Sequence, residues 1–307
     1  MVADDGERRR RGVARAVALI EARPERLVCI VGPTASGKTD IAIETCERIG
    51  GEIVSADSIQ IYRGFDIGSG KPSRDECDRA PHHVIDVLLP NEAVDAVRYA
   101  TLAERAIEDV RARGKIPVLC GGTFFWVRAL VLGLVDAPAA DEAIRARHRA
   151  QVEAEGRASL HAALAKVDPR SAARLHPNDV VRVSRALEIF ELSGRTMSDW
   201  HEEHGFRGRR MDAVLLAPGT TPEELTSRIR ARAARWLADG WLEEVERLVA
   251  EGWGESRPMG SVGYAEVRAH LRGELSREML LDAIVQSTRI FTRRQRTWLK
   301  SADVEWL

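Results

Sequence analysis

The sequence contains no uninterrupted run of about 18 apolar residues, so no segment of it is long enough to form a membrane-spanning helix. Its 307 residues include only four cysteines and no Cys-x-x-Cys spacing, which excludes a zinc ribbon, a redox motif and a disulfide scaffold. An excess of one charge is also missing, because 46 Lys and Arg residues oppose 47 Asp and Glu residues. This balance excludes a uniformly basic nucleic-acid-binding protein but leaves room for a local basic face.

A signal peptide is missing as well, because residues 1–25 lack its apolar stretch and its small-residue cleavage site. We therefore expect a cytoplasmic protein with no membrane partner. Residues 1–26 include the run Glu7–Arg11, in which four arginines follow one glutamate, and predict a loose or helical N-terminal extension. A short charged run of this kind indicates a solvated tail, with contact to nucleic acid as the alternative.

Apolar runs alternate with amphipathic segments from residue 27 onwards. The apolar runs predict strands at 27–31, 52–56, 83–86, 116–120, 213–216 and 304–307. Helical periodicity predicts helices at 38–49, 95–112 and again within 222–300, where Trp236 and Trp241 fit a helix core. This order predicts an α/β fold, a P-loop core with a mostly parallel, doubly wound sheet whose functional side chains lie at the carboxyl ends of the strands.

Strand signals vanish between residues 136 and 210, where Ala, Arg and His dominate and two or three helices fit. This change of pattern is typical of a helical insertion in an α/β core. The predicted organisation is an N-terminal extension (1–26), a P-loop catalytic core (27–135 and 211–307) and a helical insertion (136–210).

The strongest motif is a phosphate-binding loop between a predicted strand and a predicted helix. It matches G-x-x-x-x-G-K-[ST] and consists of Gly32, Pro33, Thr34, Ala35, Ser36, Gly37, Lys38 and Thr39. The glycines let the backbone approach phosphates closely, and the N–H groups at a helix N-terminus attract negative charge. Lys38 adds a positive charge, and the hydroxyl of Thr39 is suited to Mg²⁺. The motif predicts a diphosphate or polyphosphate ligand but specifies neither ATP nor a reaction.

Asp57 follows the second predicted strand, at the sheet edge that carries the phosphate loop. A carboxylate there serves as a metal ligand in phosphoryl-transfer enzymes or as a general base that takes a proton from a nucleophile. A turn or helix-capping aspartate is the alternative. Three residues further on, Gln60 has an amide of the kind that reads a base edge with two hydrogen bonds.

The last predicted helix is strongly basic. Residues 283–302 carry five positive charges and no negative ones, so the rest of a chain with a total of −1 carries −6. The five are Arg289, Arg293, Arg294, Arg296 and Lys300. A solvated helix face normally carries acidic residues for i,i+4 pairing, so this segment predicts contact with RNA phosphates.

Residues 57–72 resemble the signature of the tRNA dimethylallyltransferase (tRNA isopentenyltransferase) family, and the filling of the phosphate loop resembles theirs. Further matches follow in order at 82–86, 121–123, 177–188, 240–245, 262–264 and 292–298. The resemblance covers about residues 27–300. The C-terminal zinc finger of eukaryotic members is missing, so the resemblance is to the bacterial type.

The resemblance implies transfer of a dimethylallyl group from dimethylallyl diphosphate to the exocyclic amine (N6) of the adenosine 3′-adjacent to the anticodon of tRNA. Diphosphate leaves, and Lys38, the loop N–H groups and Mg²⁺ on Thr39 stabilise its charge. The implied catalytic residues are Thr34, which reaches the bridging oxygen, Arg232, which holds the diphosphate, and Asp57, which takes the proton of the amine. We expect the enzyme to act as a monomer.

The resemblance also implies which residues bind the tRNA anticodon stem-loop. The flipped base and its neighbours contact Asp57, Ser58, Ile59 and Gln60. Other matching positions are Thr123, Arg145, Val181, Arg182, Val183, Ser184, Arg185, Gly260, Ser261, Val262, Gly263, Tyr264 and Ala265, to which the basic helix adds Arg293 and Arg294. The insertion is expected to clamp the anticodon stem. Two positions depart from the family pattern: Phe125-Trp126 replaces a Leu-Tyr pair, and Ala265 replaces Lys or Arg.

Three other activities share part of this pattern. A free adenine-nucleotide isopentenyltransferase of the cytokinin type shares the loop and the aspartate but has little use for the insertion and the basic helix. A P-loop kinase or ATPase predicts ATP consumption. A non-catalytic tRNA-binding protein leaves the intact Lys38, Thr39 and Asp57 unexplained.

Overall fold

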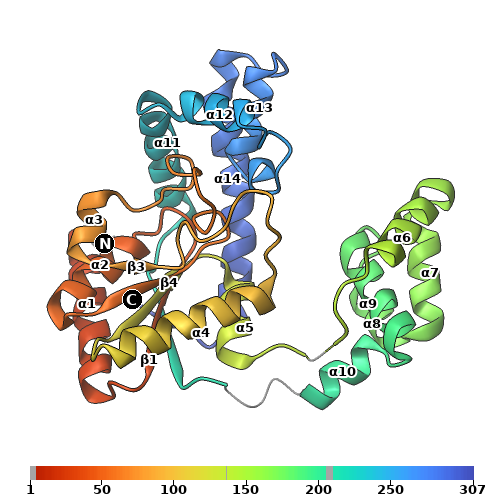
Figure 1. Ribbon diagram of the computed structural model, residues 1–307, viewed down its shortest axis with the longest axis horizontal. Coiled ribbons are helices and arrows are strands. Elements are labelled where there is room, and N and C mark those ends of the chain that lie inside the picture. Colours follow the sequence, from red (N-terminus) through yellow and green to blue (C-terminus); the bar gives the residue numbers. More distant parts are fainter. Residues whose placement is uncertain (1–4, 136, 205–209) are drawn as a thin grey trace. The chain divides into compact units, whose positions relative to one another are not determined.

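The structure is a computed structural model that describes residues 5–135, 137–204 and 210–307 (Figure 1). The chain forms two compact units, one of Met1–Val131 with Arg210–Leu307 and one of Leu132–Arg209. The predicted extension and insertion therefore include residues outside the described ranges, namely 1–4, 136 and 205–209. The chain leaves the first unit after Val131 and returns at Arg210, whose N–H donates to the Val131 carbonyl at 2.8 Å.

The first unit is built on a six-stranded sheet in which every described pairing is parallel. The strands follow one another across the sheet as β3 (His82–His83), β2 (Glu52–Ala56), β4 (Pro117–Gly121), β1 (Leu27–Val31), β5 (Ala213–Ala217) and β6 (Glu305–Trp306). The predicted α/β fold with a doubly wound sheet is confirmed. The third strand is shorter than predicted, because Val84 and Asp86 take positive φ angles of 62° and 54°, which end the extended conformation.

Helices cover both faces of this sheet. Those of the first unit are α1 (Asp5–Ala22), α2 (Lys38–Ile49), α3 (Arg74–Arg79), α4 (Ala96–Ala112), α5 (Phe124–Leu132), α11 (Pro222–Ala238), α12 (Trp241–Ala250), the 3₁₀ turn η1 (Pro258–Gly260), α13 (Tyr264–Leu271) and α14 (Arg277–Lys300). The chain steps outward from β1 through α2 to β2 and β3, and it returns through α4 to β4. Right-handed crossovers therefore place α2 and α4 on opposite faces.

The turns that follow β1 and β4 leave neighbouring strands in opposite directions, because β1 leads to β2 and β4 leads back towards β5. Ligands of open α/β sheets bind in the crevice at such a switch point, outside the carboxyl ends of the strands. Beside this edge, α11 packs along α14 (Figure 1). The fold thus brings the phosphate loop, the segment after β2 and the C-terminal helices to one place.

The N-terminal helix α1 packs on the core and is not a solvated tail. Val13, Ala16 and Ile20 are buried beside α2 and the sheet, and their i, i+3, i+7 spacing forms an apolar helix face. Arg8 is itself buried and donates to both carboxylate oxygens of Glu224 on α11, at 3.0 and 2.9 Å. The prediction of a solvated extension is therefore wrong, because this helix completes the core.

Replacing Arg8 by methionine is expected to lower the thermal midpoint by a few degrees, because a half-buried Glu224 then loses its cation. The bonds from Arg8 and from the Thr221 N–H hold the pKa of Glu224 at about 2. Because the pKa of Glu224 is lower in the folded protein than its ordinary value of 4.5, the ion pair stabilises the fold fully at pH values above 4.5. This stabilisation fades as the pH falls from 4.5 towards 2. Calorimetry should show that the difference in thermal midpoint between Arg8→Met and wild type disappears over this pH range. The exposed Arg10→Met is the control, and a gap that stays constant down to pH 2 would contradict the pairing.

The second unit is helical and has a core of its own. Its described helices are α6 (Glu142–Glu155), α7 (Arg157–Val167), α8 (Pro169–Arg174), α9 (Val180–Ser193) and α10 (Met197–His204). Leu160, Leu164 and Leu187 lie in its core, and the buried Asp168 caps α8 and accepts the Ser198 hydroxyl of α10 at 2.6 Å. Five helices stand where two or three were predicted, because short breaks divide the helical pattern. No helix in the described parts of the chain is both long and apolar enough to span a bilayer.

Candidate active site

The phosphate loop follows β1 and ends where α2 begins at Lys38. Gly37 has a φ of +85°, a left-handed conformation that favours glycine, and it directs the chain into the first turn of α2. The Ser36 hydroxyl is buried and has no hydrogen-bond partner among the described residues. The N–H groups of a first helical turn have no partner within the helix, so this loop offers unpaired donors to phosphate oxygens.

A cavity of about 270 Å³ lies beside the loop at the carboxyl edge of the sheet. Its polar wall includes Thr34 and Lys38 of the loop, Asp57 and Ser58 after β2, and Thr123 after β4. Its apolar wall comes from the C-terminal helices and includes Ile229, Ala233, Trp236, Trp241, Ile284 and Phe291. The cavity therefore joins a charged end that suits a diphosphate to an apolar end that suits a hydrocarbon group or a base.

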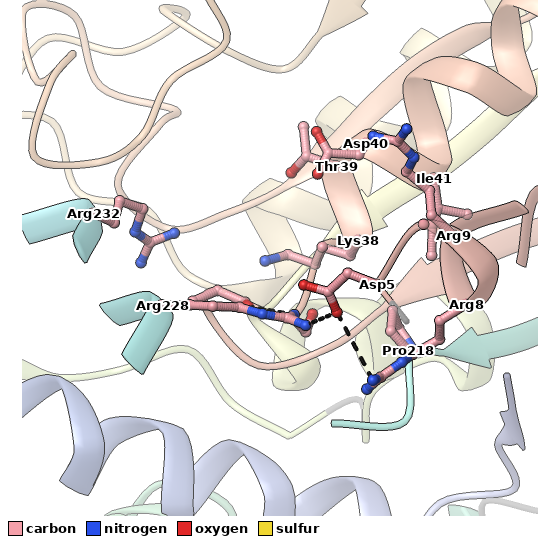
Figure 2. A pocket seen from close by; sticks show the side chains of 14 residues that line it. Asp5, Arg8, Arg9, Lys38, Thr39, Asp40, Ile41, Pro218, Arg228 and Arg232 are labelled. Carbon is pink, nitrogen blue, oxygen red and sulfur yellow. Dashed lines mark hydrogen bonds and ion pairs between the residues drawn. The ribbon is translucent and has the colours of Figure 1, made fainter. Parts of the chain in front are cut away.

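A second cavity, of about 450 Å³, adjoins the same loop and is lined also by α1 and by Arg228 and Arg232 of α11 (Figure 2). Figure 2 shows Lys38 and Arg232 reaching towards the same space, and both side chains line both cavities. Arg228 donates to the Ala35 carbonyl at 3.3 Å and forms an ion pair with Asp5. Lys38 and Arg232 thus place two cations between the cavities, where the field favours an anion.

Arg232 is tied to the phosphate loop through Thr34. Its Nη2 donates to the Thr34 Oγ1 at 2.6 Å, and its guanidinium lies 4.5 Å from the ring centre of Trp236. Burial lowers the pKa of Arg232 to about 10 and also lowers the pKa of Lys38, while the charge of Asp57 opposes both shifts. Both cations are poorly solvated and are stabilised by a bound anion. The core position predicted for Trp236 is wrong, because this side chain lines the cavity.

The structure shows Asp57 as a turn aspartate with one carboxylate oxygen to spare. Its Oδ1 accepts the N–H groups of Ile59 and Gln60 at 2.9 and 3.3 Å, as a turn aspartate does. Its Oδ2 has no hydrogen-bond partner among the described residues, and the side chain lines the cavity. One carboxylate oxygen therefore fixes the turn, and the other is available to accept a proton.

Some neighbours of Asp57 line the cavity, and Gln60 instead stabilises an adjacent loop. Ser58 and Ile59 line the cavity together with Thr123, whose hydroxyl accepts the Ser58 N–H at 3.1 Å. The Gln60 amide donates to the carbonyls of Ser69 and Gly70 at 3.3 and 2.9 Å, and its oxygen accepts the Ser55 hydroxyl. We therefore assign Gln60 to support of the loop around Ser69 rather than to reading a base edge.

The predicted segment 260–265 forms another part of the wall. Gly260, Ser261, Val262, Gly263 and Tyr264 line the cavity, whereas Ala265 does not. Tyr264 is fully buried, and its hydroxyl donates to Glu244 Oε1 at 2.6 Å, so the hydroxyl is occupied.

Glu244 is a site residue that the sequence analysis missed. It is buried on α12 and accepts the N–H groups of Asp66 and Ile67 at 3.1 and 2.6 Å, in addition to the Tyr264 hydroxyl. It thereby joins the signature loop after β2 to the first residue of α13. An acidic residue on the same helix face as Trp241, Val245 and Leu248 was the available signal.

The basic helix α14 presents its charges to solvent. Arg289, Arg293, Arg294 and Lys300 are exposed, and no described carboxylate lies within ion-pair distance of them. The side chains of Ile284, Thr288 and Gln295 line the cavity from the same helix. Gln295 was missed as a site residue; its Oε1 accepts the Thr34 N–H at 3.0 Å, and its Nε2 donates to the Gly122 carbonyl at 2.9 Å.

Two predicted RNA-binding arginines of the insertion share one buried carboxylate. Arg145 Nε and Arg185 Nη1 donate to Glu188 at 3.0 and 2.6 Å, and Glu188 is wholly buried. The two guanidiniums lower the pKa of Glu188, whereas its burial acts in the opposite direction. Both arginines therefore stabilise the insertion itself.

The other predicted positions of the insertion lie on α9. Val183 is buried in the core of the insertion, so its side chain cannot meet a ligand, and we assign it to packing. Ser184 forms a hydrogen bond with the ring of His148 at 2.8 Å. Val181 is 81% exposed and Arg182 lies beside it in solvent, so these two form the accessible part of the predicted set.

A phosphate loop at the switch point of a parallel sheet, with an arginine, a lysine and a carboxylate on the walls of one cavity, defines a P-loop enzyme for a phosphorylated substrate. Residues 60–302 match the IPP transferase family, and the chain belongs to this family. The resemblance that the sequence motifs indicated is thus confirmed.

Individual relatives agree with this assignment. The chain is 61% identical to the tRNA dimethylallyltransferase of Sorangium cellulosum (strain So ce56), covering 92% of this chain and 90% of that protein. It is 48% identical to the tRNA dimethylallyltransferase of Anaeromyxobacter dehalogenans (strain 2CP-C), covering 92% and 94%.

Solved structures show the same likeness. The tRNA isopentenylpyrophosphate transferase of Bacillus halodurans superposes with a TM-score of 0.67 at 34% identity, over 92% of this chain and 89% of that one. A eukaryotic dimethylallyltransferase described as acting on tRNA gives a TM-score of 0.79 at 27% identity, over 92% and 73%.

Proposed function

We propose that this protein transfers the dimethylallyl group of dimethylallyl diphosphate to N6 of the adenosine 3′-adjacent to the anticodon in tRNA and releases diphosphate. One observation carries the proposal: a single cavity holds two cations beside the phosphate loop, a carboxylate with a free oxygen, and an apolar wall. The family membership and the names of the relatives support it.

The leaving-group end explains the choice of cations. The allylic C–O bond breaks as negative charge grows on the diphosphate, and this charge meets Lys38, Arg232 and the N–H groups of the loop. Donors that are fixed before the reaction stabilise such charge at no cost of reorganisation. The Thr34 hydroxyl, which already accepts from Arg232, donates its own hydrogen to the bridging oxygen in this proposal.

The acceptor end requires a base. The N6 nitrogen forms the new C–N bond and loses one proton, which Asp57 accepts at the carboxylate oxygen that has no partner. An adenosine in a stacked anticodon loop must leave the stack to reach this oxygen, and the apolar and aromatic wall offers it a surface.

Magnesium fits the residues of the loop. The described residues contain no group of three or more His, Cys, Asp or Glu that forms a dedicated metal site. Mg²⁺ usually keeps several waters and binds one or two protein groups together with substrate phosphates. Thr39, the first residue after Lys38 in α2, supplies one such oxygen. Bound there, the ion neutralises part of the charge on the diphosphate.

In this proposal each unit supplies its own RNA-binding side chains, on α14 in the first unit and on α9 in the second. Arg293 and Arg294 on α14 are exposed and form no described ion pair. On α9, Val181 and Arg182 are also exposed, and Arg182 forms an ion pair with Asp179. Phosphate contacts of this kind supply affinity and position the substrate, whereas the cavity selects the base. The insertion serves as the clamp on the anticodon stem.

The deciding experiment incubates the purified protein with labelled dimethylallyl diphosphate, Mg²⁺ and bulk tRNA, and analyses the digested nucleosides by mass spectrometry. The expected product is N6-dimethylallyladenosine from tRNA, with one diphosphate released per transfer. A product formed only from free AMP would instead support a cytokinin-type enzyme, and ATP hydrolysis without prenyl transfer would support a kinase or ATPase.

Arg294→Ala is expected to weaken tRNA binding and to reduce the slope of log affinity against log salt by about one. The affinity for dimethylallyl diphosphate should not change, because this side chain points into solvent and lies outside the cavity. Filter binding over a salt series measures both effects. The exposed Arg48→Ala on α2 is the matched control, and an unchanged slope for Arg294→Ala would remove α14 from the RNA-binding surface.

A further inference from the structure

Thr34 is held from two sides. Its hydroxyl accepts Nη2 of Arg232 at 2.6 Å, and its N–H donates to Oε1 of Gln295 at 3.0 Å. Gln295 is only 7% exposed, on the face of α14 that turns towards the cavity. The phosphate loop is therefore attached to α14 through a single buried amide.

The other end of the same amide reaches the turn after β4. Gln295 Nε2 donates to the Gly122 carbonyl at 2.9 Å, and a Cβ at Gly122 would lie 2.8 Å from this nitrogen. The next residue, Thr123, donates its N–H to the Ala56 carbonyl and accepts the Ser58 N–H, both at 3.1 Å. These bonds end on the two residues that flank Asp57.

We propose that Gln295 is a positioning residue that sets the separation between Thr34 at the leaving-group end and Asp57 at the base end. The inference rests on the proposed prenyl transfer. Asp57 and Thr34 belong to different loops, and the chain of bonds through Gln295 and Thr123 connects them through protein groups alone. A displacement of about 1 Å between reacting groups costs about 10²-fold in rate.

The chemistry of the link explains why the residue is an amide. The Thr34 N–H needs an acceptor and the Gly122 carbonyl needs a donor, and the two partners fix the orientation of the amide. A carboxylate supplies only acceptors, so the Gly122 carbonyl would lose its donor and face a carboxylate oxygen instead. A protonated carboxyl group again offers one donor and one acceptor in the same shape.

Gln295→Glu turns this requirement into a pH-dependent test. With the carboxylate ionised, we expect kcat to fall about 10²-fold while tRNA affinity stays unchanged, because the RNA-binding arginines lie on the solvent side of α14. As the pH falls and the new carboxyl group protonates, the ratio of variant to wild-type kcat should rise towards one.

Other titrating groups must be separated from this effect. Lys38, Asp57 and Arg232 line the cavity with Gln295, and the buried Cys120 thiol, whose pKa is raised to about 11, interacts with Lys38. All of them are present in wild type, so the ratio of the two pH profiles removes their contribution. Gln286→Glu, which adds the same charge on the exposed side of α14, is the matched control and should follow wild type.

Two results would overturn the inference: a wild-type kcat in Gln295→Glu at every pH, or a loss that does not recover at low pH in a variant that still unfolds cooperatively. If this variant does not fold, Gln295→Met keeps the volume and removes both bonds; a wild-type kcat in it would also overturn the inference. Failure of the proposed function itself is distinguishable, because the wild-type protein would then transfer no prenyl group to tRNA.

Discussion

Asp57→Asn is expected to lower kcat for tRNA prenylation by about 10²–10⁴-fold, the usual contribution of a general base. The asparagine carbonyl still accepts the N–H groups of Ile59 and Gln60, so the turn is retained, but no oxygen remains to take the proton of the amine. The affinity for dimethylallyl diphosphate should be unchanged, because Lys38 and Arg232 keep their positions. Single-turnover assays with a saturating diphosphate substrate measure the chemical step alone.

Two further variants complete this test. Asp57→Ala should lose activity in the same range and also destabilise the fold, because it removes the turn. Asp78→Asn, on the exposed side of α3, removes one carboxylate away from the cavity and should keep wild-type kinetics. A wild-type rate in Asp57→Asn would show that another group, or water, takes the proton.

Lys38→Met is expected to lower kcat/KM by about 10²–10³-fold, the range for loss of one preorganised donor to a developing oxyanion. The same substitution should raise the thermal midpoint of the ligand-free protein. Burial lowers the pKa of Lys38, so at neutral pH the folded state holds a cation that the unfolded chain solvates better, and methionine removes this penalty.

Thermal unfolding with and without diphosphate separates the two effects. Wild type should be stabilised by diphosphate with Mg²⁺, and the stabilisation should disappear in Lys38→Met because the ligand no longer binds the folded state. The exposed Lys115→Met should behave as wild type in both measurements. A lower midpoint for free Lys38→Met would mean that the lysine stabilises the empty site rather than straining it.

Much of the fold was predictable because local patterns and the tertiary structure agree. The strands at 27–31 and 52–56 have the predicted bounds, because both segments end at turn residues and are buried along their whole length. The role of α1 was not predictable from its arginine run. Its apolar face at Val13, Ala16 and Ile20 is buried only because it packs against α2 and the sheet in the folded protein.

The site shows the same division. The phosphate loop and Asp57 follow strands directly, so sequence position alone places them at one edge of the sheet. Glu244 and Gln295 are far from them in sequence and act on backbone groups of other loops, so no local pattern reveals their partners. Arg145 and Arg185 illustrate the converse, because two arginines predicted at binding positions share an ion-pair partner, the buried Glu188, that no local pattern reveals.

The two ends of the helical insertion meet at the Val131 carbonyl, which accepts the N–H groups of both Arg210 and Met211. A segment whose entry and exit points touch imposes almost no closure entropy on its host, whatever its length. The insertion also has a core of its own, so its sequence can diverge or be exchanged while the catalytic unit stays unaltered. This junction is therefore a natural graft point, at which evolution or an engineer can exchange the insertion and keep the catalytic unit.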